Sequence, residues 1–157
     1  MRRFHSPLLK IQAVYEQQRR LAEIELSRAL SRQREAEEHV QASHDAWEAS
    51  RQMVASLLRQ SVNASMLSGA QMQIVVAQET LEQARTQLQE AAQAVLAART
   101  IYQGFNSKVD GLTKVLDEQR AEYRQDVMKD EQIVMDDRAG FRWKPTTSVH
   151  SEGTRHG

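Results

Sequence analysis

An apolar residue recurs at every seventh position of the chain from Ile74 to Tyr123. The members of this series are Ile74, Leu81, Leu88, Val95, Tyr102, Val109, Leu116 and Tyr123. A second series follows three residues behind it and contains Ala77, Ala84, Ala91, Ala98, Phe105 and Leu112, before turning polar at Gln119 and Asp126. Together they form an a/d seam, the pattern of a coiled coil. An isolated helix drifts relative to a strict seven-residue repeat, so this long seam predicts a supercoiled partner helix.

The segment before Gly69 supplies that partner, because it contains no glycine or proline after Pro7. Its weaker seam runs through Gln12, Arg19, Leu26, Gln33, Val40, Trp47 and Val54, with Tyr15, Ala22, Ala29, Ala36, Ser43, Ser50 and Leu57 as the second series. This seam is rich in small and polar residues and would pair poorly with its own copy. The chain is therefore predicted to be all-α, a long two-helix antiparallel coiled-coil hairpin.

Breaks in charge and periodicity give the predicted boundaries. The hairpin covers residues 6–140, with a first helix over about 7–61, a turn over about 62–67 and a second helix over about 69–139. From Phe141 onward the sequence has no period and many helix breakers, so residues 141–157 are predicted to be a disordered tail.

The helix ends have recognisable signals. Ser6 is a candidate N-cap and Pro7 fits the first helical position. Ser68 and Gln71 have the spacing of a capping box for the second helix, and Gly140 is the expected residue after its last turn.

The seams also suggest how the two helices align. With a turn near residues 65–66, facing residues have numbers that sum to about 131, because both helices rise equally per residue. Trp47 then meets Ala84 and Val54 meets Ala77, so large residues oppose small ones. A shift of one heptad also places Trp47 opposite an alanine, so this register is favoured but alternatives stay open.

Composition excludes several classes of function. Lys plus Arg equals Asp plus Glu at 21 each, so no global field favours nucleic acid or an anionic membrane. The chain has no cysteine, and Lys10 and Gln12 interrupt the apolar stretch that a signal peptide would need. The longest uninterrupted apolar run, Ile74–Ala77, is far too short to span a membrane.

No pattern of residues predicts catalysis, a cofactor or a metal site. The chain has no phosphate-binding glycine loop and no HExxH motif. His39 and His44 are five residues apart and do not share a helix face. Since two helices alone offer no concave site that excludes water, the protein is not expected to be an enzyme.

Apolar residues outside the seam gather near both ends of the predicted hairpin. The terminal group, predicted to bind a partner, contains Ile11, Val14, Leu21 and Ile24 on the first helix and Val127, Val134 and Met135 on the second. The turn group contains Met53, Leu58, Met66, Met72, Val75 and Val76. Single exposed apolar residues are common on helices, but two clusters at opposite ends favour contacts with other proteins.

Gly104 and Gly111 lie one heptad apart on the predicted outer face of the second helix. Each lowers helix stability by about 1 kcal/mol relative to alanine. Close approach of another backbone or a soft point for bending would explain them, although a tolerated weak stretch is the simpler interpretation.

Two segments carry a resemblance to a known family. Phe4 with Leu8–Leu9–Lys10 at the start and Met135–Asp136–Asp137–Arg138–Ala139 near the end, together with the alanine- and glutamine-rich hairpin between them, resemble the flagellar type III export protein FliJ. Its injectisome counterparts are more distant. The resemblance extends from Phe4 to Trp143 and leaves the rest of the tail without a counterpart.

The resemblance implies a stalk-like hairpin that binds the hexameric export ATPase, contacts the membrane-embedded export gate and handles export chaperones. The expected location is cytoplasmic, peripheral to the inner membrane through protein contacts alone. We expect the terminal group to bind the ATPase and the turn group to meet the gate. A generic coiled-coil scaffold, or a prefoldin-like holdase that uses its tips as clamps, is the alternative.

Overall fold

The computed structural model describes residues 3–142, and within this range it consists of two long helices. Helix α1 spans Leu8–Arg59 and helix α2 spans Ala64–Arg142. The all-α prediction is confirmed. Residues Pro7–Thr113 form one compact unit, and residues 3–6 form another with the described part of the chain from Lys114 onward. The predicted tail lies outside the described residues except for Phe141 and Arg142, which are the last residues of α2.

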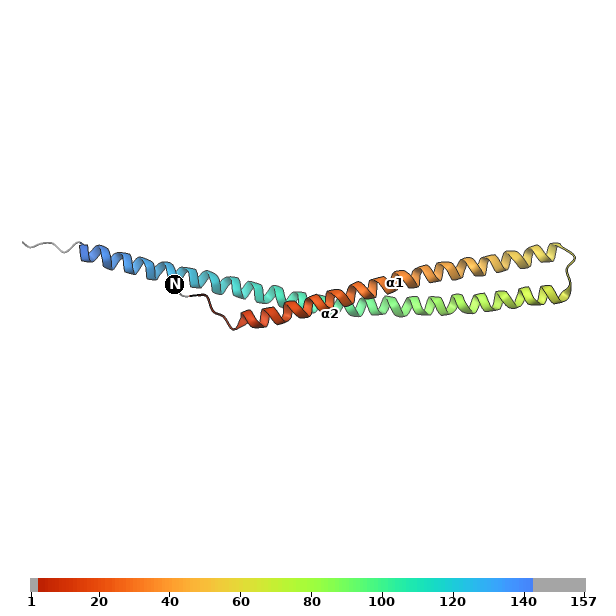
Figure 1. Ribbon diagram of the computed structural model, residues 1–157, viewed down its shortest axis with the longest axis horizontal. Helices are drawn as coiled ribbons and strands as arrows, with labels where there is room; N and C mark the ends of the chain where they lie inside the picture. The colour runs from red at the N-terminus through yellow and green to blue at the C-terminus, as the bar shows by residue number, and fades with distance from the viewer. Residues whose placement is uncertain (1–2, 143–157) are drawn as a thin grey trace, which may run out of the picture. The chain divides into compact units, whose positions relative to one another are not determined.

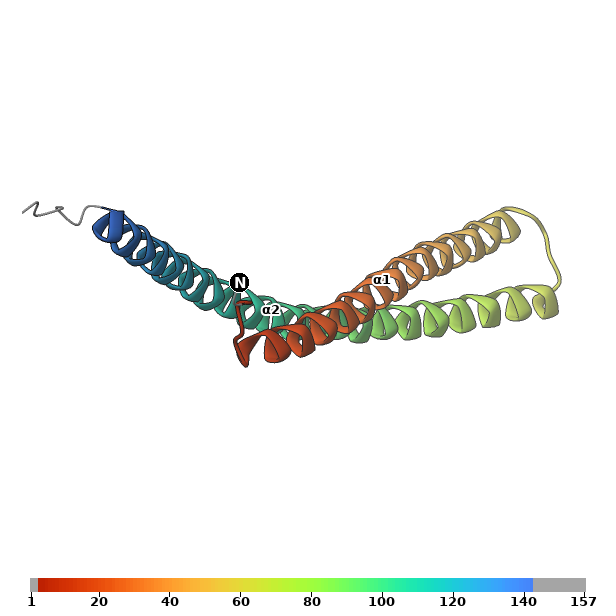
Figure 2. The same cartoon turned by 60° about the vertical axis from the view of Figure 1, so that its left-hand side comes forward.

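Within the Pro7–Thr113 unit, α1 runs antiparallel to the first part of α2 and forms a hairpin with it (Figures 1 and 2). The buried residues of α1 are Ala22, Ala29 and Ser43, all members of its predicted seam. On α2, Leu81, Ala84, Val95 and Val109 are between 0% and 4% exposed. The heptad pattern therefore predicted the core of the hairpin correctly.

The turn lies at residues 60–63, earlier and shorter than predicted. The Asn63 side chain caps α2, since its Oδ1 accepts a hydrogen bond from the Ser65 backbone N–H at 3.1 Å. Asparagine is among the best residues for this position, because its short side chain reaches an otherwise unpaired N–H group. The predicted capping box was wrong, since Ser68 and Gln71 lie inside the helix.

The other two predicted helix ends also differ from the structure. Pro7 occupies the N-cap position without a side-chain cap, and the Ser6 hydroxyl instead donates a hydrogen bond to Gln119 Oε1 at 2.7 Å. At the far end α2 continues through Gly140, which has no positive φ and so does not form the left-handed C-cap that was predicted.

The two helices align about one heptad away from the predicted register. Gln12 Nε2 donates a hydrogen bond to Thr113 Oγ1 at 2.9 Å, whereas the predicted register would have placed Gln119 opposite Gln12. The Arg19 guanidinium donates to Asn106 Oδ1 at 3.4 Å in the same alignment. The earlier turn accounts for the shift, because moving the turn moves every facing pair by the same amount.

Candidate partner-binding surfaces

The four apolar residues predicted to bind a partner on α1 are all exposed. Ile11 is 44%, Val14 52%, Leu21 57% and Ile24 48% exposed, although Ala22, next to Leu21, is only 6% exposed. The contrast follows from helix geometry, because Ala22 belongs to the seam and Leu21 points to one side of it. The hairpin core does not use these four side chains.

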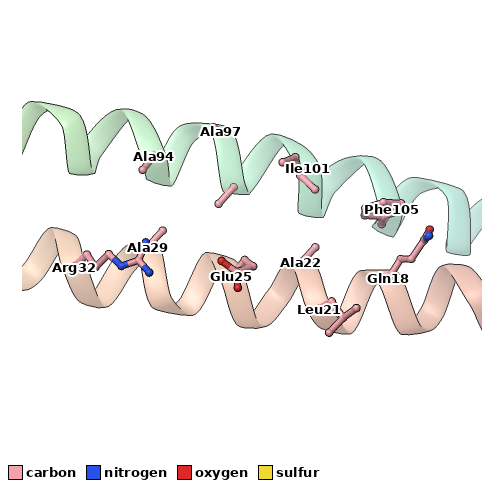
Figure 3. Close-up of a pocket in the computed structure, with 11 residues that line it drawn as sticks. Gln18, Leu21, Ala22, Glu25, Ala29, Arg32, Ala94, Ala97, Ile101 and Phe105 are labelled. Atoms are coloured by element: carbon pink, nitrogen blue, oxygen red, sulfur yellow. The ribbon is translucent and has the colours of Figure 1, made fainter.

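Leu21 lies in an apolar groove along one side of the hairpin (Figure 3). The groove has a volume of about 520 Å³ and is lined by Gln18, Leu21, Ala22, Glu25, Ala29 and Arg32 from α1 and by Ala94, Ala97, Ala98, Ile101 and Phe105 from α2. Five of these eleven residues are alanines. Small side chains on both helices leave room here for a neighbouring element to pack closely.

The α2 side of this groove was missed in the sequence analysis. Ile101 is 56% exposed, and Ala94 and Ala97 are exposed beside it. The signal was available, because Ala94 and Ile101 immediately precede the seam positions Val95 and Tyr102. In an antiparallel pair, the residue before each a position lies on the same flank of both helices. We call this side the apolar flank, defined by Ile11, Val14 and Leu21 on α1 and by Ala94, Ala97 and Ile101 on α2.

Charged side chains also lie on this side of the hairpin, since Glu25 and Arg32 line the groove. Glu25 Oε1 pairs with Arg28 Nη1 at 2.9 Å, and both side chains are more than half exposed, so this ion pair contributes little to stability. The Lys108 ammonium lies 5.3 Å from the ring centroid of Tyr15 and 5.4 Å from that of Phe105. Lys108 therefore covers the aromatic pair at the seam with its charge.

The three predicted residues on the C-terminal part of α2 do not share one environment. Val127 is half-buried, whereas Val134 is 49% and Met135 70% exposed. Val134 and Met135 line a shallow pocket with Asp130, Glu131 and Arg138. The prediction omitted the nearby exposed residues Met128, Ile133 and Phe141. Val127, Val134 and Phe141 are spaced by seven, a repeat that could have revealed the third member.

The segment before α1 packs in the same unit as this part of α2. The Phe4 ring lies edge-on to Tyr123 with centroids 5.7 Å apart, and the Arg120 guanidinium lies 5.7 Å from the Phe4 centroid. Leu116 is only 1% exposed. These contacts explain why Phe4 is part of the folded chain although it precedes the first helix.

The six residues of the turn group are all exposed, from 51% for Val75 to 67% for Met72. Met53 and Met66 directly precede seam positions of their helices, whereas Leu58 directly follows one and Met72 and Val76 lie on other faces of α2. The structure therefore brings these residues to the same region next to the turn but does not align them as a single stripe.

No group of three or more potential metal-ligating side chains occurs within residues 3–142. Over the same residues, neither helix is sufficiently long and apolar to cross a membrane.

The model of the family described as flagellar FliJ protein matches residues 4–146 of the chain. The chain belongs to the FliJ family. It is therefore a component of the flagellar export apparatus, and the family is a non-catalytic one. The match begins at Phe4 and covers both helices, so the family resemblance in the sequence is confirmed over its whole extent. No curated protein and no solved structure matches this FliJ-family chain.

Proposed function

We propose that this FliJ-family chain is a stalk-like coiled coil that binds the hexameric export ATPase and links it to the export gate and to export chaperones. It works in the cytoplasm, peripheral to the inner membrane through protein contacts. The observation that carries the proposal is the row of exposed aliphatic residues on α1, Ile11, Val14, Leu21 and Ile24, which we call the stripe. Val14 and Leu21 are more than half exposed, and the seam does not need them.

The stripe offers enough apolar surface for a protein contact. Full burial of one aliphatic side chain contributes about 1.5–3 kcal/mol. Ile11, Val14, Leu21 and Ile24 are already about half buried, so each adds less than that, and part of the gain offsets the loss of motional freedom on association. A contact of this size suits a subunit that must bind and release.

The turn group supports a second contact, with the export gate. Three of its six members are methionines, whose flexible side chains adapt to different surfaces. Helix α1 has 52 residues and is about 78 Å long at 1.5 Å per residue, so the stripe and the turn group lie far apart within the hairpin unit. One chain can therefore engage two partners at the same time.

The experiment compares two double variants with one single variant that serves as the control. Val14→Ser with Leu21→Ser should abolish stimulation of the export ATPase and leave the circular dichroism spectrum nearly unchanged. Met72→Ser with Val76→Ser should preserve that stimulation and reduce gate binding and motility. Leu96→Ser is the control, because Leu96 is 62% exposed and lies on the other flank of the hairpin.

Two results would contradict the proposal. If the turn variant abolishes ATPase stimulation and the stripe variant has no effect, the assignment of the two ends is reversed. If neither variant changes ATPase activity or gate binding, the chain acts as a scaffold or holdase instead.

A further inference from the structure

Nothing within the hairpin explains the glycines at positions 104 and 111. Neither has a positive φ, so any L-residue could adopt the backbone conformation. A Cβ atom added to either would meet no atom within 4 Å, so no close contact inside the chain requires a missing side chain. Both lie within a helix, where each costs about 1 kcal/mol relative to alanine. No contact within the hairpin therefore requires glycine at either position.

Both glycines lie on the apolar flank. Gly104 follows Ile101 by three residues and Ala97 by seven, and both of those residues line the groove. Gly111 follows one heptad later. Residues three and seven apart share a helix face, so Ala97, Gly104 and Gly111 form a line of small residues beside the groove. On the same flank, α1 carries two large exposed residues one heptad apart, Val14 and Leu21.

The hydrogen bonds between α1 and α2 place the large and small residues at matching heights. Gln12 is hydrogen-bonded to Thr113. Val14 is two residues after Gln12 on α1, and Gly111 is two residues before Thr113 on α2. Arg19 bonds to Asn106, and the same two steps lead to Leu21 and Gly104. Since both helices rise equally per residue, Val14 lies level with Gly111 and Leu21 lies level with Gly104.

We propose that the apolar flank binds a second copy of this chain. A two-fold axis parallel to the helices places α1 of one copy over α2 of the other and preserves the height of every residue. Val14 and Leu21 of each copy then pack on Gly111 and Gly104 of its partner, so that each large side chain meets an open helix surface. The contact is isologous, because the same patch serves both copies.

The alternative two-fold arrangement fits poorly. If the two copies point in opposite directions, α1 faces α1 and α2 faces α2. Leucine and valine then oppose each other while the glycines face glycines, which leaves gaps that reduce dispersion contacts.

This dimer would hide Val14 and Leu21, so a chain in the dimer cannot use them to bind the ATPase. The inference does not depend on the proposed function, because it rests on the geometry of the hairpin alone. The two uses can be separated: substitution of the glycines disturbs the dimer and leaves Val14 and Leu21 unchanged.

Sedimentation equilibrium of the full chain at concentrations up to about 100 μM tests the proposal, since small interfaces give weak dimers. We expect reversible dimerisation of the wild type. Gly104→Gln with Gly111→Gln should weaken it at least tenfold without lowering the melting temperature, because glutamine favours helix and its Cβ meets no atom within 4 Å in the single chain. Leu96→Gln on the opposite flank should leave the dimer unchanged. A wild type that stays monomeric, or a dimer that the glycine substitutions do not weaken, would overturn the proposal.

Disulfide formation tests the arrangement of the two copies, and the chain has no cysteine of its own. Chains carrying Leu21→Cys are mixed with chains carrying Gly104→Cys under mild oxidation. If the copies point the same way, a disulfide between a Leu21→Cys chain and a Gly104→Cys chain should form in preference to a disulfide between two chains of the same variant. Preference for the symmetric Leu21→Cys product would show that α1 faces α1 and would contradict the proposed packing.

Discussion

The seam and the exposed faces of the same two helices carry similar residues, yet they have opposite relations to solvent. On α2, Val95 is 4% exposed and its neighbour Leu96 is 62% exposed. On α1, Ala22 is 6% exposed and its neighbour Leu21 is 57% exposed. Position in the heptad, not size or hydrophobicity, decides which residue is buried. The seam therefore stabilises the hairpin, and apolar residues outside it are available for other proteins.

The largest difference in free energy of unfolding is expected when a carboxylate replaces a seam residue in one variant and its exposed neighbour in another. Val95→Asp should lower the free energy of unfolding by about 3–4 kcal/mol, because it replaces a buried aliphatic side chain with a charge that has no partner. Leu96→Asp should change it by less than about 0.5 kcal/mol, as for a surface position. Chemical denaturation followed by circular dichroism measures both. Equal losses would mean that the seam has been assigned to the wrong face of α2.

A smaller loss in the free energy of unfolding is expected at the polar part of the seam. Thr113→Val removes the acceptor for Gln12 and should cost about 1 kcal/mol, the usual contribution of one hydrogen bond. Thr100→Val is a matched control, because Thr100 makes the same hydrogen bond to a backbone carbonyl four residues earlier but is exposed. If both variants unfold at the same denaturant concentration, the Gln12 bond does not contribute to the alignment of the helices.

The smallest effect should be a gain in stability. Gly104→Ala should raise the free energy of unfolding by about 0.5–1 kcal/mol, because the backbone is helical and the added methyl group meets open space. Thermal melting of dilute protein, where self-association is negligible, measures the effect on the single chain. A loss of stability there would show that some contact within the hairpin does require glycine at this position.

The sequence was sufficient to predict the two helices and their buried residues, because a strict seven-residue repeat allows only one face to remain covered. It was not sufficient to predict the register. A seam of alternating alanines and large residues repeats every heptad, so a shift of seven gives nearly the same packing. The alignment instead agrees with the position of the turn at Asn63 and with polar pairs such as Gln12 with Thr113, to which an apolar pattern gives no weight.

Half of the candidate site could also be predicted. The exposed residues on α1 stood out as large aliphatic side chains away from the seam. Their counterparts on α2 did not, because Ala94 and Ala97 are unremarkable in an alanine-rich helix and matter only when α1 lies beside them. The two glycines were visible in the sequence, but their relation to Val14 and Leu21 required the observed register.

The separate roles of seam and flank are tested most directly by measuring thermal unfolding and ATPase stimulation on the same preparation of the Val14→Ser, Leu21→Ser variant. The account predicts a melting temperature within about 3 °C of the wild type, since both residues are more than half exposed, together with loss of stimulation. A melting temperature that falls as far as that of Val95→Asp would contradict it, because the flank would then be part of the core. Full stimulation by a normally folded variant would contradict the proposed role of Val14 and Leu21 in binding the ATPase.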